Sequence, residues 1–257
     1  MTIELERKPF KLGKYGFLTL IVCLFITFIW QFPIGFISPQ IEKMSHCKVG
    51  LYQAQGTIWK GSSGISLSEL AQDGGCKVPF AVTERIYWTT SCQPLSGQCE
   101  TSVSMSRMTQ AIQINFHLKD IQIKNNQIQL PANLLEGLGS PWNSLHPQGI
   151  LDIHWNDLTF SKNTDGMISV KALNLSSSIS KITPLGSYEL KVNLNSPMSA
   201  NLITLNGPLI LNGQGQLNNQ ALHFEGTASS TPEAKNSLTG LLSVIGIKNG
   251  DNYQLKF

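Results

Sequence analysis

One segment constrains the fold of this chain more than any other. From Tyr15 to Ile37 the sequence reads YGFLTLIVCLFITFIWQFPIGFI, and no charged residue occurs between Lys14 and Glu42. About 20 apolar residues are enough to cross a bilayer as a helix. The sequence therefore predicts a transmembrane helix over residues 15–37. A buried soluble helix is the weaker interpretation, because it would need an apolar partner on every face.

A basic cluster precedes this segment and consists of Arg7, Lys8, Lys11 and Lys14. No comparable cluster follows it, so the positive-inside rule predicts a cytoplasmic N-terminus (residues 1–14) and an exported domain (residues 38–257). A cleaved signal peptide is the alternative. The apolar run is longer than a signal peptide requires, and WQFPIGFISPQ lacks a small-x-small cleavage site. The sequence favours a retained, single-pass anchor.

Charge is sparse in the rest of the chain. Charged residues make up 14% of the 257 residues, and the net charge is +3. The basic excess belongs to the N-terminus, so the exported part is close to neutral, and nucleic acid is not an expected partner. A chain of this length can bury a real core, as one large domain or two small ones.

The cysteines fit an exported domain. Cys23 lies inside the apolar segment, and the exported side carries Cys47, Cys76, Cys92 and Cys99. An oxidising periplasm permits disulfides, and four thiols allow three pairings. Cys92 and Cys99 enclose the turn-like QPLSGQ, so a hairpin disulfide there, with Cys47–Cys76 as the other pair, is the favoured arrangement. A zinc site is the alternative, but no CxxC pair occurs and the spacings do not fit a zinc finger.

Period-two alternation recurs along the exported part. Apolar and polar residues alternate over 112–119, 151–156 and 188–194, which is typical of antiparallel strands with one buried face. The apolar positions change phase at Ile121, which predicts a bulge or a turn near Asp120. The fold class is therefore predicted to be mainly β: a single N-terminal transmembrane helix, then one curved, mostly antiparallel β-sheet domain with one or two short covering helices.

Two segments read as the covering helices. PANLLEGLG, Pro131–Gly139, opens on proline and closes on glycine. The second begins at Thr231, which can act as the N-cap, with Pro232 at the first helical position. Its apolar residues fall at helical spacing and form one stripe, which predicts a helix covering one side of the sheet, with docking to a partner as the alternative. The stripe consists of Leu238, Leu241, Leu242 and Ile245.

No motif in the sequence points to catalysis. HExxH, GxSxG, GxxxxGK[ST] and GxGxxG do not occur, and the five histidines are scattered. The closest acidic pair, Asp152 and Asp157, flanks His154, and polar residues that alternate along a strand are ordinarily solvated. We therefore predict no catalytic residue, no metal and no cofactor. The pattern favours a binding, scaffolding or lipid-handling role, with an envelope hydrolase as the least favoured reading.

The stretch GTIWKG, residues 56–61, places Trp59 between Gly56 and Gly61. The glycines allow a tight bend or a close backbone approach, and the tryptophan supplies a large apolar body with one hydrogen-bond donor. We expect this stretch to be the first strand entry of the sheet. Trp59 is expected to fill one end of the core, and a docking role is the alternative.

Four segments carry a family resemblance: GTIWKG at 56–61, PLGSYELKV at 184–192, LNGPLILNGQG at 205–215 and FEGTASSTPEAKNSLTGLLSVIG at 224–246. The first is similar to S-G-T-L-W-x-G, and the last to F-x-G-x-A followed by a Leu-rich helix and L-x-x-x-G. In this order, behind a short basic N-terminus and one apolar segment, they resemble the type II secretion system protein N family, also called general secretion pathway protein N. The Cys92–Cys99 segment departs from that pattern.

The resemblance implies a non-catalytic, accessory inner-membrane protein with a periplasmic domain, in the machine that moves folded proteins across the outer membrane. Its implied partners are the other inner-membrane platform subunits, notably the protein C subunit. A more distant similarity to AsmA-like periplasmic proteins implies the alternative, a groove for lipid or another hydrophobic chain. An apolar sheet face that no helix covers would favour the groove, and a face closed by the helix over 231–245 would favour the scaffold.

Overall fold

The computed structural model describes residues 14–68, 70–71, 75–77, 80–93, 96–106, 108–140, 142–218 and 221–256. Its helical elements, with η for 3-10 helices, are α1 (Lys14–Trp30), η1 (Ile34–Phe36), α2 (Ser38–Met44), η2 (Ala132–Leu138), α3 (Trp142–Leu145), η3 (Pro232–Ala234) and α4 (Lys235–Ile245). The first eight strands are β1 (Val49–Gly56), β2 (Lys60–Leu67), β3 (Phe80–Gln93), β4 (Gln98–Met105), β5 (Ile112–Phe116), β6 (Ile121–Ile123), β7 (Asn126–Pro131) and β8 (Pro147–Trp155). The others are β9 (Leu158–Phe160), β10 (Met167–Ser177), β11 (Gly186–Asn193), β12 (Ser199–Asn206), β13 (Leu209–Asn218), β14 (Ala221–Ser230), β15 (Ile247–Asn249) and β16 (Asn252–Lys256).

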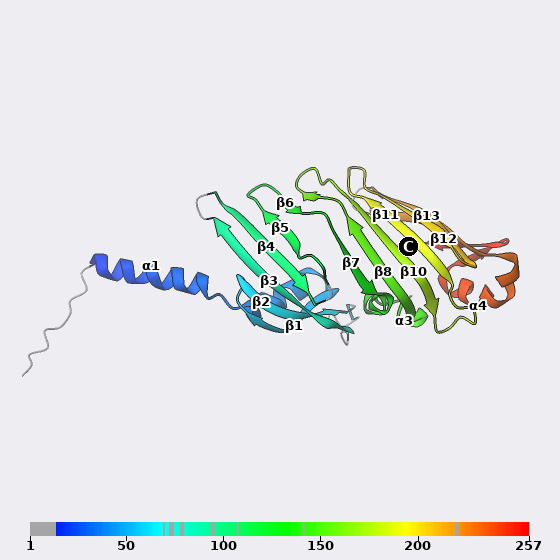
Figure 1. The fold of residues 1–257 in the computed structure, drawn as a ribbon, viewed down its shortest axis with the longest axis horizontal. Helices are drawn as coiled ribbons and strands as arrows, with labels where there is room; N and C mark the ends of the chain where they lie inside the picture. The colour runs from blue at the N-terminus through cyan, green and yellow to red at the C-terminus, as the bar shows by residue number, and fades with distance from the viewer. Residues whose placement is uncertain are drawn as a thin grey trace, which may run out of the picture.

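The strands form two antiparallel sheets. A seven-stranded sheet has the order β1-β2-β3-β4-β5-β6-β9, and a nine-stranded sheet has the order β15-β16-β14-β13-β12-β11-β10-β8-β7. They follow one another along the long axis of the molecule, with α1 projecting from the N-terminal end (Figure 1). The expected fold class is thus confirmed in its main part: mainly β, antiparallel, with a few short helices.

The two sheets meet in one unbroken register. Ile123 of β6 pairs with Leu158 of β9, and Asn126 of β7 pairs with Trp155 of β8. From the first pair to the second, one strand advances by three residues and its partner goes back by three. β6–β7 and β9–β8 are therefore two long strands, each interrupted at the same level. The seven- and nine-stranded parts therefore form one continuous curved surface.

The expected turn near Asp120 is present. Ile121 and Ile123 pair with Phe116 and Ile114 across the β5–β6 hairpin, and cross-strand partners share a face. The His117 amide donates to the Asp120 carbonyl at 2.9 Å and closes the turn. The turn thus absorbs the change in apolar phase.

A second change of phase lies at the junction of the sheets. Apolar residues sit at Ile121 and Ile123 before it and at Ile128 and Leu130 after it, and β8–β9 changes phase at the same level. A one-residue change would normally send these side chains to the other face. Residues 124–125 and 156–157 lie outside the strands and interrupt the alternation in both partners at the same level. The register is therefore kept across the interruption, and we infer that the apolar residues stay on one face.

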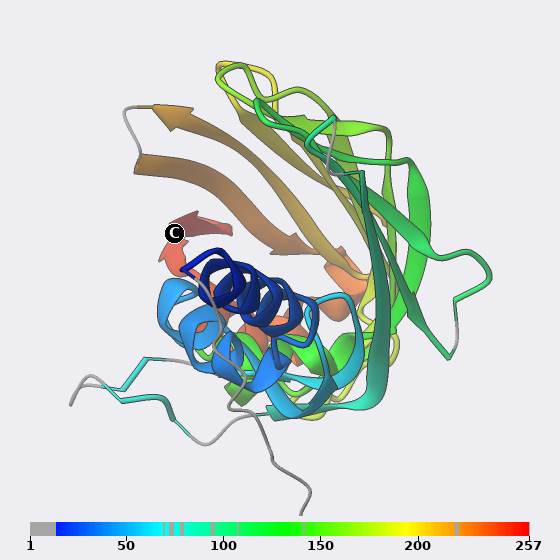
Figure 2. The ribbon, with the colours of Figure 1, turned by 90° about the vertical axis from the view of Figure 1, so that its left-hand side faces the viewer.

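The densest core lies at the C-terminal end of the sheet. Leu238 of α4 is fully buried, and Leu241 and Leu242 are 5% and 3% exposed. They pack with buried residues of the sheet and α3: Leu145, Leu185, Tyr188, Leu209, Ala228, Tyr253 and Leu255. The strands curve around the short helices (Figure 2). The helix over 231–245 therefore covers this end of the sheet, with Thr231 in the N-cap position but no capping bond from its side chain.

The N-terminal apolar segment differs from the expected single helix over residues 15–37. α1 ends at Trp30, and η1 follows Pro33 as a separate turn in which Ile34 is only 8% exposed. Proline at position 33 has no amide hydrogen to continue the helix, and it disfavours helical geometry in the residue before it. Within the described residues, no helix combines the length and apolarity that a membrane crossing requires.

The segment Pro131–Gly139 also differs from the expected helix. Pro131 is the last residue of β7, and the residues after it form the 3-10 helix η2 instead of an α-helix. Gly139 does end the element, with a φ of 87° that favours glycine. Ala132 and Leu134 are buried, so this short turn packs against the sheet.

Glu189 of β11 is a buried carboxylate held by neighbours. Burial by itself would raise its pKa, but the Ser169 hydroxyl (3.0 Å), the Lys191 ammonium (3.4 Å) and the charge of Lys171 outweigh burial and lower the pKa below its ordinary value of 4.5. A carboxyl whose pKa is lower in the folded than in the unfolded state stabilises the fold at pH values above its unfolded pKa. That stability is lost as the pH falls through the folded pKa.

We expect Glu189→Gln to lower the free energy of unfolding by about 1 kcal/mol at pH 7, because it removes a charge-assisted hydrogen bond. The deficit should shrink as the pH falls below 4.5, where the wild-type carboxyl also becomes neutral. Urea unfolding at pH 7 and at pH 3 measures both values. An equal deficit at the two pH values would show that the charge of Glu189 contributes nothing.

Candidate functional site

GTIWKG forms the hairpin loop between β1 and β2. Gly56 pairs with Gly61, and Gly56 has a φ of +92°, which a residue with a side chain rarely adopts. A Cβ on Gly61 would collide with the Trp88 indole. The expected bend and close approach are thus present, but the loop is not the first strand entry, because β1 precedes it.

Trp59 joins this loop to the end of α1. Its indole Nε1 donates to the Ile29 carbonyl at 2.9 Å, and the Ile58 amide donates to the Phe32 carbonyl at 3.1 Å. The last residues of a helix leave carbonyls without an intrahelical partner. The hairpin donates to one carbonyl in the last turn of α1 and to another just beyond its end. Trp59 therefore positions the N-terminal helix against the sheet, which the sequence alone did not predict.

An open groove of about 510 Å³ lies between this N-terminal region and the sheet. η1, α2 and the hairpin loop form one wall, and β3, β4 and β5 form the other. The volume falls within the range of roughly 300–1,000 Å³ that is usual for ligand sites. The lining residues are Ile34, Ile37, Ile41, Leu51, Ile58, Trp59, Ile86, Trp88, Thr90, Cys92, Cys99, Thr101, Val103 and Phe116.

The polar side-chain atoms of the groove already have partners. Thr90 and Thr101 bond to each other at 2.9 Å, and the Trp88 indole donates to the Thr57 carbonyl at 3.0 Å. Trp59 donates to Ile29 as described, and the two cysteines are joined to each other. None of the described lining residues is charged. The groove therefore offers a ligand apolar contact and almost no hydrogen bonding.

The structure pairs the four cysteines beyond residue 38 as Cys92–Cys99 and Cys47–Cys76. Cys92 and Cys99 are cross-strand partners in the β3–β4 hairpin. Cys47 lies between α2 and β1, and Cys76 between β2 and β3, 29 positions further along. The second pair therefore fastens α2, and with it one wall of the groove, to the sheet.

For protein purified under non-reducing conditions, we expect peptide mapping to recover these two pairs. Cys23 is exposed and unpaired, so alkylation should label it alone. Cys47→Ser should lower the free energy of unfolding by about 3 kcal/mol, the usual contribution of a disulfide that closes a loop of this size. Recovery of four labelled exported-side thiols would refute the pairing.

The predicted α4 stripe faces the core. Leu238, Leu241 and Leu242 are buried under the helix, and Ile245 packs partly buried against the same cluster. In this chain the stripe is therefore occupied by intramolecular packing, which leaves Val244, 51% exposed, on the outer side of the helix.

The acidic pair considered as a catalytic candidate has structural contacts. Asp152 accepts a hydrogen bond from the side-chain amide of Gln127 at 2.6 Å, and His154 is exposed on the same strand. Asp157 accepts a hydrogen bond from the backbone amide of Asn125 at 2.7 Å. This bond, with Lys124 nearby, lowers the pKa of Asp157. The Asp157–Asn125 bond lies at the junction between the sheets, and the Asp152–Gln127 bond joins β7 to β8. Among the described residues, no group of three His, Cys, Asp or Glu side chains is placed to hold a metal.

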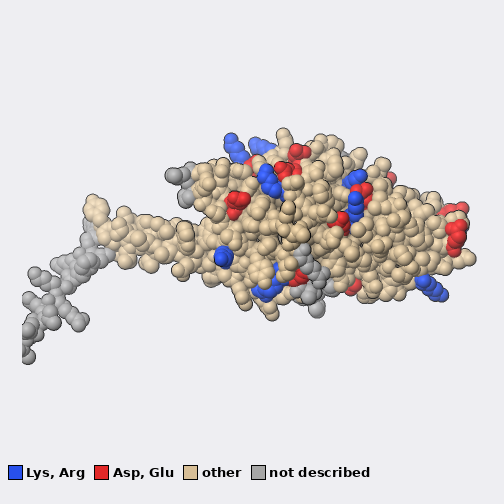
Figure 3. Space-filling model, viewed as in Figure 1, with Lys and Arg blue, Asp and Glu red and all other residues tan. Residues whose placement is uncertain are grey.

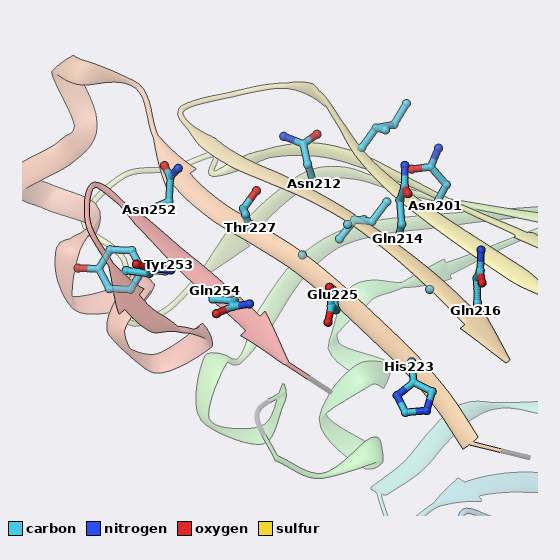
Figure 4. Close-up of a pocket in the computed structure, with 16 residues that line it drawn as sticks. Asn201, Asn212, Gln214, Gln216, His223, Glu225, Thr227, Asn252, Tyr253 and Gln254 are labelled. Carbon is cyan, nitrogen blue, oxygen red and sulfur yellow. The ribbon is translucent and has the colours of Figure 1, made fainter. Parts of the chain in front are cut away.

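A second hollow, of about 890 Å³, is polar. Amide side chains from β12, β13 and β16 line it, including Asn201, Gln214 and Asn252 (Figure 4). These positions alternate with the apolar residues under α4, so the hollow is on the other face of the sheet. It is larger than the groove, and like the groove it is open to solvent. Its single carboxylate, Glu225, and single histidine, His223, do not form a catalytic arrangement.

Beyond Lys14, its first residue, α1 contains no charged residue, and charged side chains lie over the body of the molecule (Figure 3). In the face shown, the projecting helix carries neither basic nor acidic side chains (Figure 3). Large apolar side chains cover it instead, with Leu24 61% and Phe25 64% exposed. The functional features of the described chain are thus an uncovered apolar helix, an adjoining apolar groove and a curved antiparallel sheet.

These features define a class of protein: a mainly β, antiparallel protein with an exposed apolar N-terminal helix. The family model of the type II secretion system protein N matches residues 48–256, which is most of the chain. This chain belongs to the type II secretion system protein N family. Searches of curated proteins and of solved structures give no significant match. The family places the chain in type II secretion and protein transport, as a secretion-system component.

Proposed function

We propose that this protein is an accessory scaffold of the type II secretion system, held at the inner membrane by its N-terminal apolar segment, with residues 38–257 in the periplasm. The family match over residues 48–256 carries the proposal. The platform subunits of the same machine, notably the protein C subunit, are its proposed partners. The role is one of interaction and not of catalysis.

The composition of the N-terminal region supports attachment to a membrane. The segment from Tyr15 to Ile41 is uncharged, and the α1 side chains are exposed and apolar. Exposing such a surface to water is unfavourable by about 25 cal/mol per Å². A contiguous exposed apolar surface of this kind marks a membrane or protein contact. The basic residues before it favour a cytoplasmic N-terminus.

The sheet supports a scaffolding role. Its outer surface displays polar and apolar side chains on hydrogen-bonded strands, among them Tyr87 (48% exposed) and Ile203 (37% exposed). A rigid, hydrogen-bonded surface presents contact residues with little loss of conformational entropy on binding. The α4 helix stabilises one end of this surface from the inside.

A secretion assay tests the proposal. In the source bacterium, loss of this chain should leave a type II cargo protein folded in the periplasm and reduce its amount in the medium, and the wild-type chain should restore export. A matched strain that lacks a core platform subunit shows how far cargo export falls when the secretion system is inactive. Unchanged cargo export, together with normal assembly of the platform, would contradict the proposal.

A further inference from the structure

We propose that the apolar groove between η1–α2 and strands β3–β5 binds one acyl chain of a membrane phospholipid. The inference rests on the proposed attachment of α1 to the membrane. It assigns the groove a ligand class that a scaffold by itself does not require.

The chemistry of the groove selects an apolar chain. Its lining is uncharged, and the donors of Trp59 and Trp88 and the hydroxyls of Thr90 and Thr101 are used within the protein. A sugar or a peptide backbone placed there would lose water without gaining hydrogen bonds, at about 1–3 kcal/mol for each unpaired polar group. Each methylene of an acyl chain would instead gain about 0.8 kcal/mol on burial.

Two apolar or terminal segments of this chain that could be considered as occupants do not fit the groove. Residues 1–13 include Glu4, Glu6, Arg7, Lys8 and Lys11, so they are charged. They also join α1 at its far end, and at about 1.5 Å per residue a 17-residue helix separates its two ends by about 25 Å. The α4 stripe is buried in its own core at the opposite end of the sheet. The occupant therefore comes from outside the chain.

The mouth of the groove adjoins α1. Trp59 lines the groove and bonds the Ile29 carbonyl in the last turn of α1, while Ile34 and Ile37 continue from the helix into the groove wall. Phe116, on the opposite wall, is 38% exposed. Hydrocarbon around the end of α1 would thus contact the groove directly, and an acyl chain could enter it without crossing a charged surface.

The inner face of the sheet stays apolar beyond the groove. Val170 pairs with Ile153 on one side and with Leu190 on the other, so the three share a face, and all three are only partly buried. None of them is among the residues that pack against the α4 core. The helix over 231–245 therefore closes one end of the sheet and does not cover these three apolar positions. This arrangement favours a groove over a fully closed core.

The test uses the full chain reconstituted in phosphatidylethanolamine–phosphatidylglycerol vesicles. These vesicles contain a phosphatidylcholine tracer with a photoactivatable diazirine in one acyl chain. After irradiation, digestion and mass spectrometry locate the crosslinks. We expect crosslinks on α1 and also on β3 and β4 peptides. Val103→Asp, inside the groove, should reduce the β3–β4 crosslinks at least fivefold. The matched control Ser104→Asp, on the other face of β4, should leave them unchanged.

The outcomes separate the groove from the membrane anchor. Crosslinks on α1 with none on β3 or β4 would overturn the acyl-chain site and leave the anchor intact, whereas an absence of crosslinks on α1 would contradict the anchor. If Val103→Asp does not fold, as judged by trypsin resistance, Phe116→Asp at the exposed rim serves instead. Undiminished crosslinking in a folded groove variant would also overturn the proposal.

Discussion

Replacing Leu241 and Leu242 with aspartate is expected to unfold the C-terminal half of the sheet. Both side chains are buried against Tyr253, Leu255 and Ala228. Truncating one buried leucine costs about 2–5 kcal/mol, and an unpaired buried charge costs more. The two substitutions together should therefore remove most of the 5–15 kcal/mol that is usual for a folded domain. Urea unfolding and resistance to trypsin measure the loss.

Val244→Asp is the matched control, because Val244 lies on the same helix and is 51% exposed. It should change the free energy of unfolding by no more than about 0.5 kcal/mol, as surface substitutions usually do. Normal trypsin resistance of the Leu241→Asp/Leu242→Asp protein would mean that the stripe does not form the core, and that it is free to bind a partner.

Removal of residues 1–30 is expected to release the protein from the membrane without unfolding it. Exported behind a cleavable signal peptide, the shortened chain should appear in the soluble periplasmic fraction, while the full chain stays with membranes after a carbonate wash. The cut loses the Trp59–Ile29 hydrogen bond but keeps Ile34, which is 8% exposed in the groove wall. Continued sedimentation of the shortened chain with carbonate-washed membranes would contradict a single N-terminal attachment.

A deeper cut provides the comparison. Removing residues 1–37 also removes Ile34 and Ile37, which line the groove. Loss of one buried isoleucine costs about 2–5 kcal/mol. The chain without residues 1–37 should therefore be released as well, but it should unfold at a lower urea concentration than the chain without residues 1–30.

Short-range pattern predicted part of the sheet. Alternation located β5, β8 and β11, and the change of phase at Ile121 correctly indicated a turn at Asp120. Leucine spacing located α4, because one buried stripe repeats with the helical period. These features depend on neighbours within a few residues, and for that reason the sequence alone shows them.

Features that depend on distant contacts were missed. Ile34 and Ile37 read as the end of a membrane segment, and the structure places them in the wall of a groove. Both settings are apolar, so composition does not distinguish them. Trp59 read as a core plug, yet its indole bonds Ile29, 30 positions earlier. The pattern offered one signal, the proline at 33, which separates α1 from the residues after it.

Contact with the secretion machine is the central claim, and site-specific photo-crosslinking in intact cells tests it most directly. A photoreactive phenylalanine analogue replaces Tyr87, Ile203 or Val244, which are 48%, 37% and 51% exposed, and Leu238, fully buried, is the matched control. We expect crosslinks from at least one exposed position to inner-membrane platform subunits, notably the protein C subunit, and none from Leu238. Crosslinks from every exposed position to proteins outside the type II secretion system, with none to its subunits, would contradict it.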